Sequence, residues 1–198
     1  KKAGLDPEKP PANFADILNY ARKITALGNG ITGFDLAGSC GGCGVYTLSP
    51  YAWADGQEIL SDGGKRVEIN NKSFKAIFTL YKQLSDEKLV DSSDKAQDGS
   101  TWPANFEAGK VGMLPLGSPI VGDLLKQTKF PWGVTPLMSP DGSKTSTFIG
   151  GDVAGISATS KHPAQAWDFL KWTLDENAQV EIIAKNGDLP GRTDLSGN

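Results

Sequence analysis

Apolar residues recur along the chain at helical spacing in two long stretches. Asn13 precedes the first stretch and Asn71 precedes the second, and asparagine is a common residue at the N-cap of a helix. The apolar positions follow i, i+3, i+4 and i+7, namely Phe14, Ile17, Leu18, Ala21 and Ile24 in the first and Phe74, Ile77, Phe78, Tyr81 and Leu84 in the second. Both stretches are therefore predicted to be helices with one buried face.

Shorter apolar stretches predict further elements. We expect helices over residues 46–54, 118–125 and 177–185 and from Pro163 to Leu174. Short strands are expected over 66–69 and 110–117, within 130–143 and within 147–158. Glycine or proline separates many of these segments and favours turns between them. Helices that alternate with short strands place the chain in the α/β class.

Composition narrows the classes of partner. The chain has 198 residues and a formal net charge of −3, without a run of basic residues, which argues against a nucleic-acid partner. Glycine or proline breaks its longest apolar stretches, so no segment is predicted to span a membrane. The opening residues read as a helix end followed by a loop, without a visible signal peptide, so we expect a piece of a longer protein.

Two features suggest chemistry that their context does not support. The stretch from Gly28 to Gly33 fits the dinucleotide-binding pattern G-x-G-x-x-G, but it follows a helix, whereas that pattern must follow a strand and open a helix. We expect a glycine helix end and a tight turn there. His162, the single histidine, lies at a helix entrance without a nucleophile pattern, which argues against a catalytic role.

The two cysteines, Cys40 and Cys43, form a C-x-x-C pair in the glycine-rich stretch GSCGGCG. A structural zinc site needs four ligands, which two cysteines and a distant histidine do not supply. A redox-active dithiol places its first cysteine at a helix N-terminus, and the flanking glycines predict that no helix crosses the pair. We favour a disulfide that closes a short loop in an oxidising compartment, with free thiols and metal or redox chemistry as alternatives. No metal and no cofactor are predicted.

Six segments carry a resemblance to a known family. In chain order they are residues 3–26 beginning AGLDP, YAWADGQEIL with DGGK, FEAGKVGML, WGVTPLMSPDG, the stretch from GGDVAG to LDENAQ, and NGDLPGR. Together they resemble the family 1 extracellular solute-binding proteins of ABC importers, which include the maltodextrin-binding proteins. The chain departs from that family in its cysteine loop, in Gly112 where alanine is usual, and in PLGSP where many members have Gly-x-Trp.

The resemblance implies one lobe of a two-lobe, type II periplasmic-binding-protein-like fold with part of the crossover back to the other lobe. Residues 1–148 would form the C-terminal-lobe α/β domain, 149–152 the hinge, and 153–198 an incomplete segment that returns to the N-terminal lobe. The helix from Pro163 to Leu174 would then lack the sheet that it covers in the family. We expect it to self-associate with a second copy of the chain.

The resemblance also implies a function. The chain would be the substrate-binding component of an ABC importer and not an enzyme. It would bind a mono- or oligosaccharide, or glycerol phosphate, in an interlobe cleft and deliver it to the transmembrane subunits of a permease. It would work outside the cytoplasm, either in the periplasm or lipid-anchored at the cell surface. The competing hypothesis is a secreted thiol/disulfide or hydrolytic enzyme that uses the Cys40/Cys43 loop or acidic residues.

Aromatic residues are the first candidates for a sugar site, because a sugar ring has an apolar face and a hydrogen-bonding edge. Trp102 lies between a polar loop and a proline-opened helix and is expected to be exposed. Tyr46 and Trp53 follow the cysteine loop, which we expect at the rim of the cleft. Core packing is the alternative for these three, and it is our interpretation of the remaining tryptophans, Trp132, Trp167 and Trp172.

Polar and glycine positions complete the candidate ligand-binding residues. Ser118, at a predicted helix N-terminus, offers a hydroxyl and free backbone amides, with helix capping as the alternative. Gly150 and Gly151 permit close backbone approach and hinge rotation. Asp152 can accept hydrogen bonds from sugar hydroxyls, or serve a turn, and Arg192 closes the last segment of the resemblance.

Overall fold

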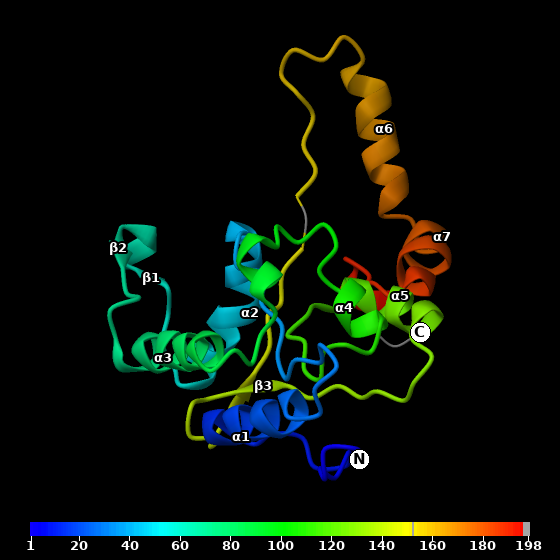
Figure 1. The fold of residues 1–198 in the computed structure, drawn as a ribbon. Helices are drawn as coiled ribbons and strands as arrows, with labels where there is room; N and C mark the ends of the chain where they lie inside the picture. Colours follow the sequence, from blue (N-terminus) through cyan, green and yellow to red (C-terminus); the bar gives the residue numbers. More distant parts are fainter. Residues whose placement is uncertain (152, 196–198) are drawn as a thin grey trace. The chain divides into compact units, whose positions relative to one another are not determined.

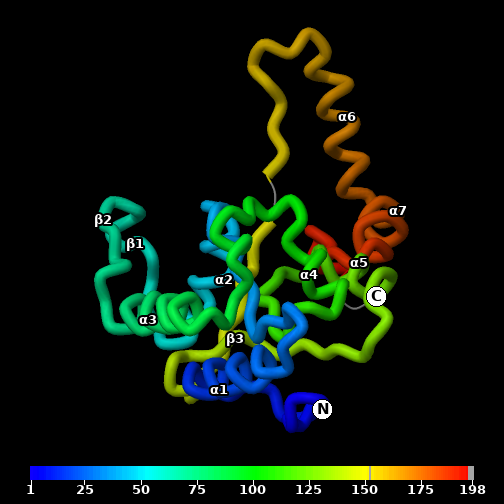
Figure 2. The backbone as a smooth tube through the Cα atoms, viewed as in Figure 1, coloured from blue at the N-terminus to red at the C-terminus, as the bar shows by residue number. Residues whose placement is uncertain are grey.

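The computed structural model describes residues 1–151 and 153–195 and divides into two compact units (Figures 1 and 2). Unit 1 comprises Lys1–Leu116 and Gln127–Phe148, and unit 2 comprises Gly117–Lys126 and Ile149–Asn198. Residues 117–126 therefore group with the second unit, although the sequence placed them in a continuous domain over residues 1–148. The assignment of these units to two lobes and a hinge stays a prediction.

Three helices build unit 1. They are α1 (Phe14–Thr25), α2 (Gly41–Ala54) and α3 (Lys72–Asp86). The asparagine caps of α1 and α3 are confirmed, because the Asn13 side chain accepts a hydrogen bond from the Asp16 amide and the Asn71 side chain accepts one from the Phe74 amide. Short turns of helix follow in η2 (Ser92–Ala96) and α4 (Ala104–Glu107).

The core of unit 1 lies where these helices meet. Its most deeply buried side chains include Ile17, Tyr51, Ile77, Leu80 and Leu84, each at most 2% exposed. Ile17, Ile77 and Leu84 lie on the inner helix faces that the two amphipathic patterns predict, and Leu80 of α3 and one aromatic ring of α2 join them. Phe78, which the pattern also places on the inner face of α3, is 48% exposed, so the prediction is wrong for this residue. Full burial of a leucine or isoleucine side chain stabilises a fold by about 1.5–3 kcal/mol, so this cluster holds the unit together.

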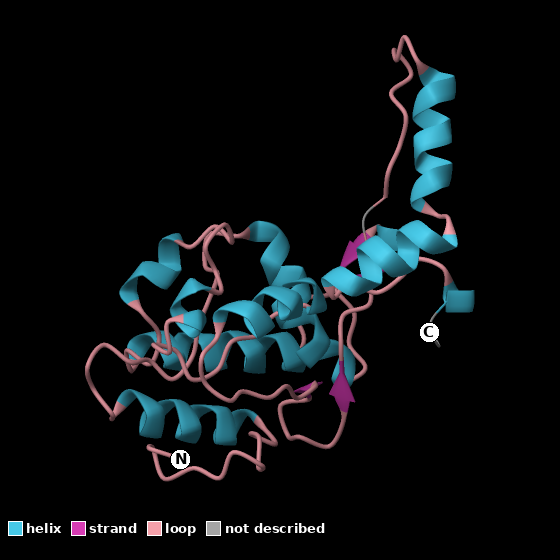
Figure 3. Ribbon diagram, turned by 90° about the vertical axis from the view of Figure 1, so that its right-hand side faces the viewer, coloured by secondary structure: helices cyan, strands magenta, loops and turns pink. Residues whose placement is uncertain are grey.

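Strands are short in the described part of the chain, where helices and loops predominate (Figure 3). β1 (Leu60–Ser61) pairs antiparallel with β2 (Arg66–Val67) around the turn η1 (Asp62–Gly64), and β3 (Leu137–Met138) pairs antiparallel with β4 (Thr145–Ser146). The strand predicted over 110–117 is wrong, and so is the one predicted within 147–158, since the described residues there form none.

A backbone alignment replaces the strand expected at 110–117. The Thr32 amide donates to the Lys110 carbonyl at 2.9 Å, and the Gly112 amide donates to the Thr32 carbonyl at 3.0 Å. The Asp35 amide donates to the Met113 carbonyl at 3.1 Å, so residues 110–113 run parallel to 32–35. A single parallel bridge, Thr32 with Val111, results. A strand needs a continuous partner, and this segment has one only over a few residues.

Unit 2 is a chain of short helical segments. It holds η3 (Ser118–Ile120), α5 (Val121–Gln127, whose last residue groups with unit 1), α6 (Pro163–Thr173), α7 (Glu176–Ala178), the π-helical η4 (Gln179–Ile183), η5 (Ala184–Asn186) and η6 (Thr193–Leu195). The buried Gln179 side chain ties this unit together: its Nε2 donates to the Thr173 carbonyl, and its Oε1 accepts from the Gly191 amide, both at 2.6 Å. The helix predicted over 177–185 is thus present as α7, η4 and η5 in succession.

The helix α6 carries exposed aromatic residues. Trp167 is 56% exposed, Phe169 is 60% exposed and Trp172 is 45% exposed. The prediction that Trp167 and Trp172 pack in a core is wrong in this structure, because no element of the described chain buries them. Trp132 is partly buried. No helix within residues 1–151 and 153–195 is long and apolar enough to cross a membrane.

Candidate functional site

Two of the predicted ligand-binding residues, Tyr46 and Trp53, meet a third aromatic residue in unit 1. They are seven residues apart on α2, which places them two turns apart on one helix face. Phe148 follows β4, which packs against α2. The Phe148 ring lies 4.4 Å from the Tyr46 ring, edge to face, and 6.0 Å from the Trp53 ring in a stacked arrangement. We call Tyr46, Trp53 and Phe148 the aromatic cluster.

The aromatic cluster combines apolar area with hydrogen-bonding groups. The Tyr46 side chain is 49% exposed, and Trp53 and Phe148 are half-buried. The Trp53 indole nitrogen donates to the Glu58 carboxylate at 3.0 Å. This carboxylate fixes the indole and keeps further lone pairs for other donors. The arrangement can therefore take an apolar ring face and offer a carboxylate to hydroxyl groups.

Sequence reasoning missed Phe148. The sequence signal for it is weak: Phe148 lies two positions before Gly150 and Gly151, which were predicted to form part of a hinge. Its place in the cluster depends on β4 lying against α2, nearly a hundred residues earlier in the chain, and local pattern does not report such a contact.

The structure confirms a disulfide between Cys40 and Cys43, with Cα atoms 5.2 Å apart, and contradicts the prediction that no helix crosses the pair. Cys40 is the N-cap of α2, and its Sγ accepts a hydrogen bond from the Cys43 amide at 3.2 Å. The glycines at the first two helical positions are tolerated because amides in the first turn have no intrahelical partner to lose. Thr47 strengthens the next turn by donating to the Cys43 carbonyl at 2.8 Å.

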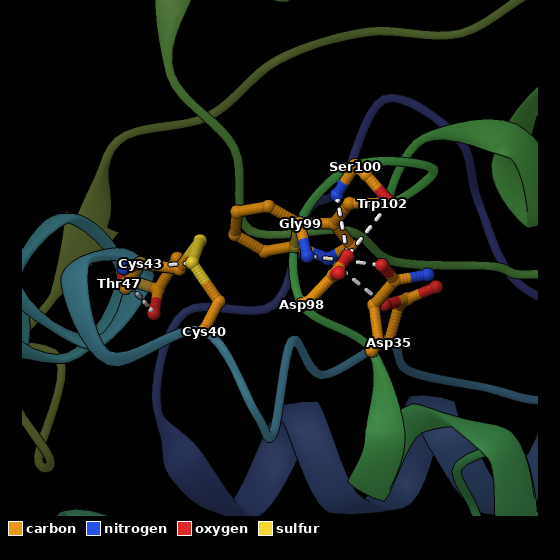
Figure 4. Close-up of a disulfide and its surroundings, with 9 residues drawn as sticks. Asp35, Cys40, Cys43, Thr47, Asp98, Gly99, Ser100 and Trp102 are labelled. Carbon is orange, nitrogen blue, oxygen red and sulfur yellow. Dashed lines mark hydrogen bonds between the residues drawn. A yellow bond between two sulfur atoms is a disulfide. The ribbon is translucent and has the colours of Figure 1, made fainter.

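The segment before the disulfide is bound to η2 and to the polar residues that follow it. The Gly38 amide donates to the Asp94 carbonyl and the Ser39 amide donates to the Gln97 carbonyl, both at 2.9 Å. Gly99 lies against the disulfide (Figure 4), and a Cβ atom added to it would come within 3.2 Å of the Cys43 sulfur and 3.3 Å of the Cys40 sulfur. The cysteine loop is therefore supported from one side by residues 94–99.

Trp102 is buried, at 8% exposure, so the prediction of an exposed ring is wrong. Its indole nitrogen donates to the Asp35 carboxylate at 2.9 Å (Figure 4). Asp35 is itself buried, and loss of water around its carboxylate, together with the nearby charge of Asp94, raises the pKa to about 7. The hydrogen bond from Trp102 opposes this rise without cancelling it. Burial also raises the pKa of Asp94, to about 6.

Three predicted ligand-binding residues lie in the described part of unit 2 with identified surroundings. Ser118 is exposed and opens η3, and Gly117 holds the cap position without a side-chain cap. Gly151 is exposed and has no atom within 4 Å of the position of an added Cβ. The Arg192 guanidinium is engaged by both oxygens of the Asp194 carboxylate and by the Leu174 carbonyl.

The other predicted positions add little to a site. Gly150 is exposed. Asp152 lies outside the described residues. His162, for which no catalytic role was expected, is the N-cap residue of α6 and is exposed. Among the residues that the structure describes, no group of three or more His, Cys, Asp and Glu side chains is placed to hold a metal ion.

A polar hollow of about 340 Å³ lies in unit 1 between η2 and α4. Hydroxyl, amide and carboxylate groups dominate its lining, which comprises Ser93, Ala96, Gln97, Asp98, Thr101, Ala104 and Asn105. Two of these groups bind one another, because the Gln97 amide nitrogen donates to the Thr101 hydroxyl, and the Asp98 carboxylate accepts from Ser100, which is outside the lining. The hollow lacks an aromatic wall, in contrast to the aromatic cluster.

A family model for the bacterial extracellular solute-binding proteins matches residues 1–196. The chain belongs to this family. The resemblance inferred from the six segments is therefore confirmed. A binding protein of Brucella abortus is 28% identical over 193 residues, and the match covers 96% of this chain and 46% of that protein. The sn-glycerol-3-phosphate-binding periplasmic protein UgpB of Brucella abortus is 26% identical, with 96% of this chain and 44% of that protein covered.

A solved structure supports the fold class. The maltose/maltodextrin-binding domain MalE of Bdellovibrio bacteriovorus, bound to maltotriose, is 23% identical and superimposes with a TM-score of 0.75 over 96% of this chain and 50% of that one. The predicted fold, an α/β part of a periplasmic-binding-protein fold, is confirmed at this level. The chain spans about half the length of the curated relatives that it matches.

Proposed function

We propose that this chain is part of the substrate-binding component of an ABC importer and contributes the aromatic cluster to a carbohydrate site. The observation that carries the proposal is the contact of Tyr46 and Trp53 with Phe148, which leaves aromatic surface exposed beside a carboxylate. A sugar presents an apolar face to such rings and donates its hydroxyl hydrogens to the carboxylate. The bound ligand would pass to a permease, outside the cytoplasm, in keeping with the family.

A neutral sugar fits the cluster better than a phosphate ester. The relatives include a protein named for sn-glycerol 3-phosphate and a domain bound to maltotriose, so a phosphate ester and a neutral sugar are both candidate ligands. The charged group that contacts the cluster is the Glu58 carboxylate, at the Trp53 indole nitrogen. A phosphate ester carries negative charge and would be repelled by this group, whereas sugar hydroxyls would donate to it.

Binding without chemical conversion is part of the same proposal. A catalytic site needs a nucleophile or an acid–base pair placed for a reaction, and the cluster consists of rings and one carboxylate that accepts an indole hydrogen. We therefore expect a sugar to be recovered unchanged after incubation with the protein. Appearance of a shorter or oxidised sugar would support the enzyme hypothesis instead.

Calorimetric titration with glucose, maltose, maltotriose and sn-glycerol 3-phosphate tests the ligand class. An aromatic contact adds about 0.5–1.5 kcal/mol beyond its buried area, which is about 2- to 10-fold in affinity. We expect Tyr46→Ala and Phe148→Ala to weaken sugar binding by that factor each. Phe169→Ala removes an aromatic side chain of similar size from the exposed face of α6 and serves as the control.

The titration separates the alternatives. The resemblance implies that part of the cleft belongs to sequence outside this chain, so we expect weak binding. The ligand concentration in the titration should therefore reach tens of millimolar. Saturable heat for a neutral sugar that falls with Tyr46→Ala, and not with Phe169→Ala, supports the proposal. Tighter binding of sn-glycerol 3-phosphate than of every neutral sugar would overturn the ligand class. An equal effect of Phe169→Ala would overturn the site.

A further inference from the structure

The Cys40–Cys43 disulfide lies at the amino end of α2, and the proposed carbohydrate site makes no use of it (Figure 4). Cys40 occupies the N-cap and Cys43 the third helical position, so the two sulfurs join the residue before the helix to its first turn. A structural disulfide commonly links distant segments and is shielded by the core. This one closes a loop of two intervening glycines, so it removes little conformational entropy from the unfolded chain and adds little to the stability of the fold.

The disulfide is accessible from the side of its own loop. Gly41 and Gly42 are exposed, and apart from their chain neighbours and the backbone of α2 itself no atom lies within 4 Å of a Cβ added to either glycine. The two cysteines are half-buried, with Gly99 closing the opposite side. No other segment of the described chain therefore covers the loop at its two glycines, and this is the side from which we expect a thiol to reach the half-buried sulfurs.

The amino end of α2 favours negative charge on Cys40. The Cys43 amide already donates to the Cys40 sulfur at 3.2 Å, and the Gly41 and Gly42 amides belong to the first turn, where amides have no intrahelical acceptor. A helix of 14 residues adds its dipole to these amides. A thiolate at this position is therefore stabilised by a direct hydrogen bond and by the field of the helix.

The charged groups on residues 94–99 include some that disfavour a thiolate and one that favours it. Asp94, Lys95 and Asp98 lie on the segment whose backbone supports the cysteine loop. The Asp98 carboxylate accepts from the Ser100 amide and hydroxyl, and the Asp94 carboxylate accepts from the Asp91 amide and from the backbone of Leu36, so both carboxylates already have hydrogen-bond donors. Two carboxylates oppose a thiolate and one ammonium favours it, whereas the amide of Cys43 contacts the sulfur directly.

We propose that Cys40–Cys43 is an exchangeable redox site, which a dithiol reduces while the protein stays folded. A thiolate of the dithiol attacks the Cys43 sulfur, the bond between the two protein sulfurs breaks, and Cys40 leaves as a thiolate held by the Cys43 amide. The second thiol of the reductant then attacks its own sulfur in the mixed disulfide and releases Cys43. Two electrons pass from the dithiol to the protein, the reductant becomes a cyclic or internal disulfide, and two protons end on the protein thiols or in water.

Reduction in the native state is the first test. The protein is incubated with dithiothreitol without denaturant, free thiols are counted after removal of the reductant, and circular dichroism reports the fold. We expect two thiols per chain and an unchanged helical spectrum. The appearance of thiols only after addition of urea, or loss of the helical signal together with the disulfide, would overturn the proposal and leave a structural disulfide.

A matched pair of variants tests the role of the helix end. Cys43→Ser leaves Cys40 as the single thiol and keeps the amide that donates to it, and Cys40→Ser leaves Cys43 alone with a serine as a good N-cap. The rate of alkylation by iodoacetamide is measured against pH. We expect the half-maximal rate of the Cys40 thiol at least one pH unit below the ordinary cysteine value of about 8.5, and below that of Cys43. A midpoint at or above about 8.5 for Cys40, or equal midpoints, would contradict the assignment of Cys40 as the leaving thiolate.

Discussion

The buried hydrogen bond between Asp35 and Trp102 predicts that the stability of unit 1 depends on pH. The Asp35 carboxylate is 1% exposed and accepts from the Trp102 indole at 2.9 Å. The Asp35→Asn substitution is nearly isosteric, and its side-chain oxygen can still accept this hydrogen bond. It removes the charge, which is the part of the interaction that burial disfavours.

The magnitude follows from the pKa. Burial and the nearby charge of Asp94 raise the pKa of Asp35 from 3.8 to about 7. This difference, at 1.36 kcal/mol for each pH unit, corresponds to about 4 kcal/mol. Below about pH 4 both the folded and the unfolded chain hold the proton. Between about pH 4 and 7 the unfolded chain releases it and the folded chain keeps it, so the free energy of unfolding falls as pH rises.

Urea unfolding at pH 5 and pH 8, followed by circular dichroism, measures the effect. About 3 kcal/mol of the loss should fall between these two pH values, and Asp35→Asn should lack that part of the loss. Asp94, whose pKa is raised to about 6, contributes in the same direction and remains in both proteins. The exposed Asp123 provides the control, since Asp123→Asn should leave the difference between pH 5 and 8 unchanged.

A result that would refute this reasoning is simple to recognise. If Asp35→Asn loses as much stability between pH 5 and 8 as the unmutated protein, the Asp35 carboxyl is not protonated in the folded state near neutral pH. A strong destabilisation of Asp35→Asn at both pH values would show instead that the amide cannot accept the Trp102 hydrogen in this setting.

Three further predictions concern packing. Gly33→Ala should destabilise the protein by about 3 kcal/mol or more in urea unfolding, because the added Cβ would overlap the backbone of Ala21, whereas Gly155→Ala, with no atom within 4 Å of its Cβ position, should change stability by less than about 0.5 kcal/mol. Asn71→Ala should cost about 1 kcal/mol through the lost cap of α3, and an unchanged urea midpoint would contradict that role. Light scattering at high concentration should show self-association that Trp167→Ala weakens, because this ring is 56% exposed on α6, and a strictly monomeric unmutated chain would disprove that prediction.

Several features were predictable from local pattern. The helices α1 and α3 follow from apolar residues at helical spacing after Asn13 and Asn71, because capping and amphipathic periodicity act within one or two turns. The disulfide follows from two cysteines three positions apart, which share one short loop. The family follows from the order of six segments, each of them weak evidence alone.

Other features depend on contacts between distant parts of the chain. Trp102 looked exposed because its neighbours in sequence are polar, yet Asp35, 67 residues earlier, supplies the acceptor that allows its indole to be buried. Phe148 joins Tyr46 only because β4 lies against α2. Residues 110–113 form no strand, because they align with residues 32–35 for only a few hydrogen bonds.

There is a physical reason why some features follow from local sequence and others only from tertiary contacts. The sequence by itself determined the elements whose stabilising interactions lie within a few residues: capped amphipathic helices, a tight cysteine loop and glycine turns. Tertiary structure decided which aromatic rings are exposed and which are buried, since a buried polar group needs a partner and that partner can come from any part of the chain. Tyr46 and Trp102 were both candidates for an exposed ring, and packing placed one ring at the surface and the other against Asp35.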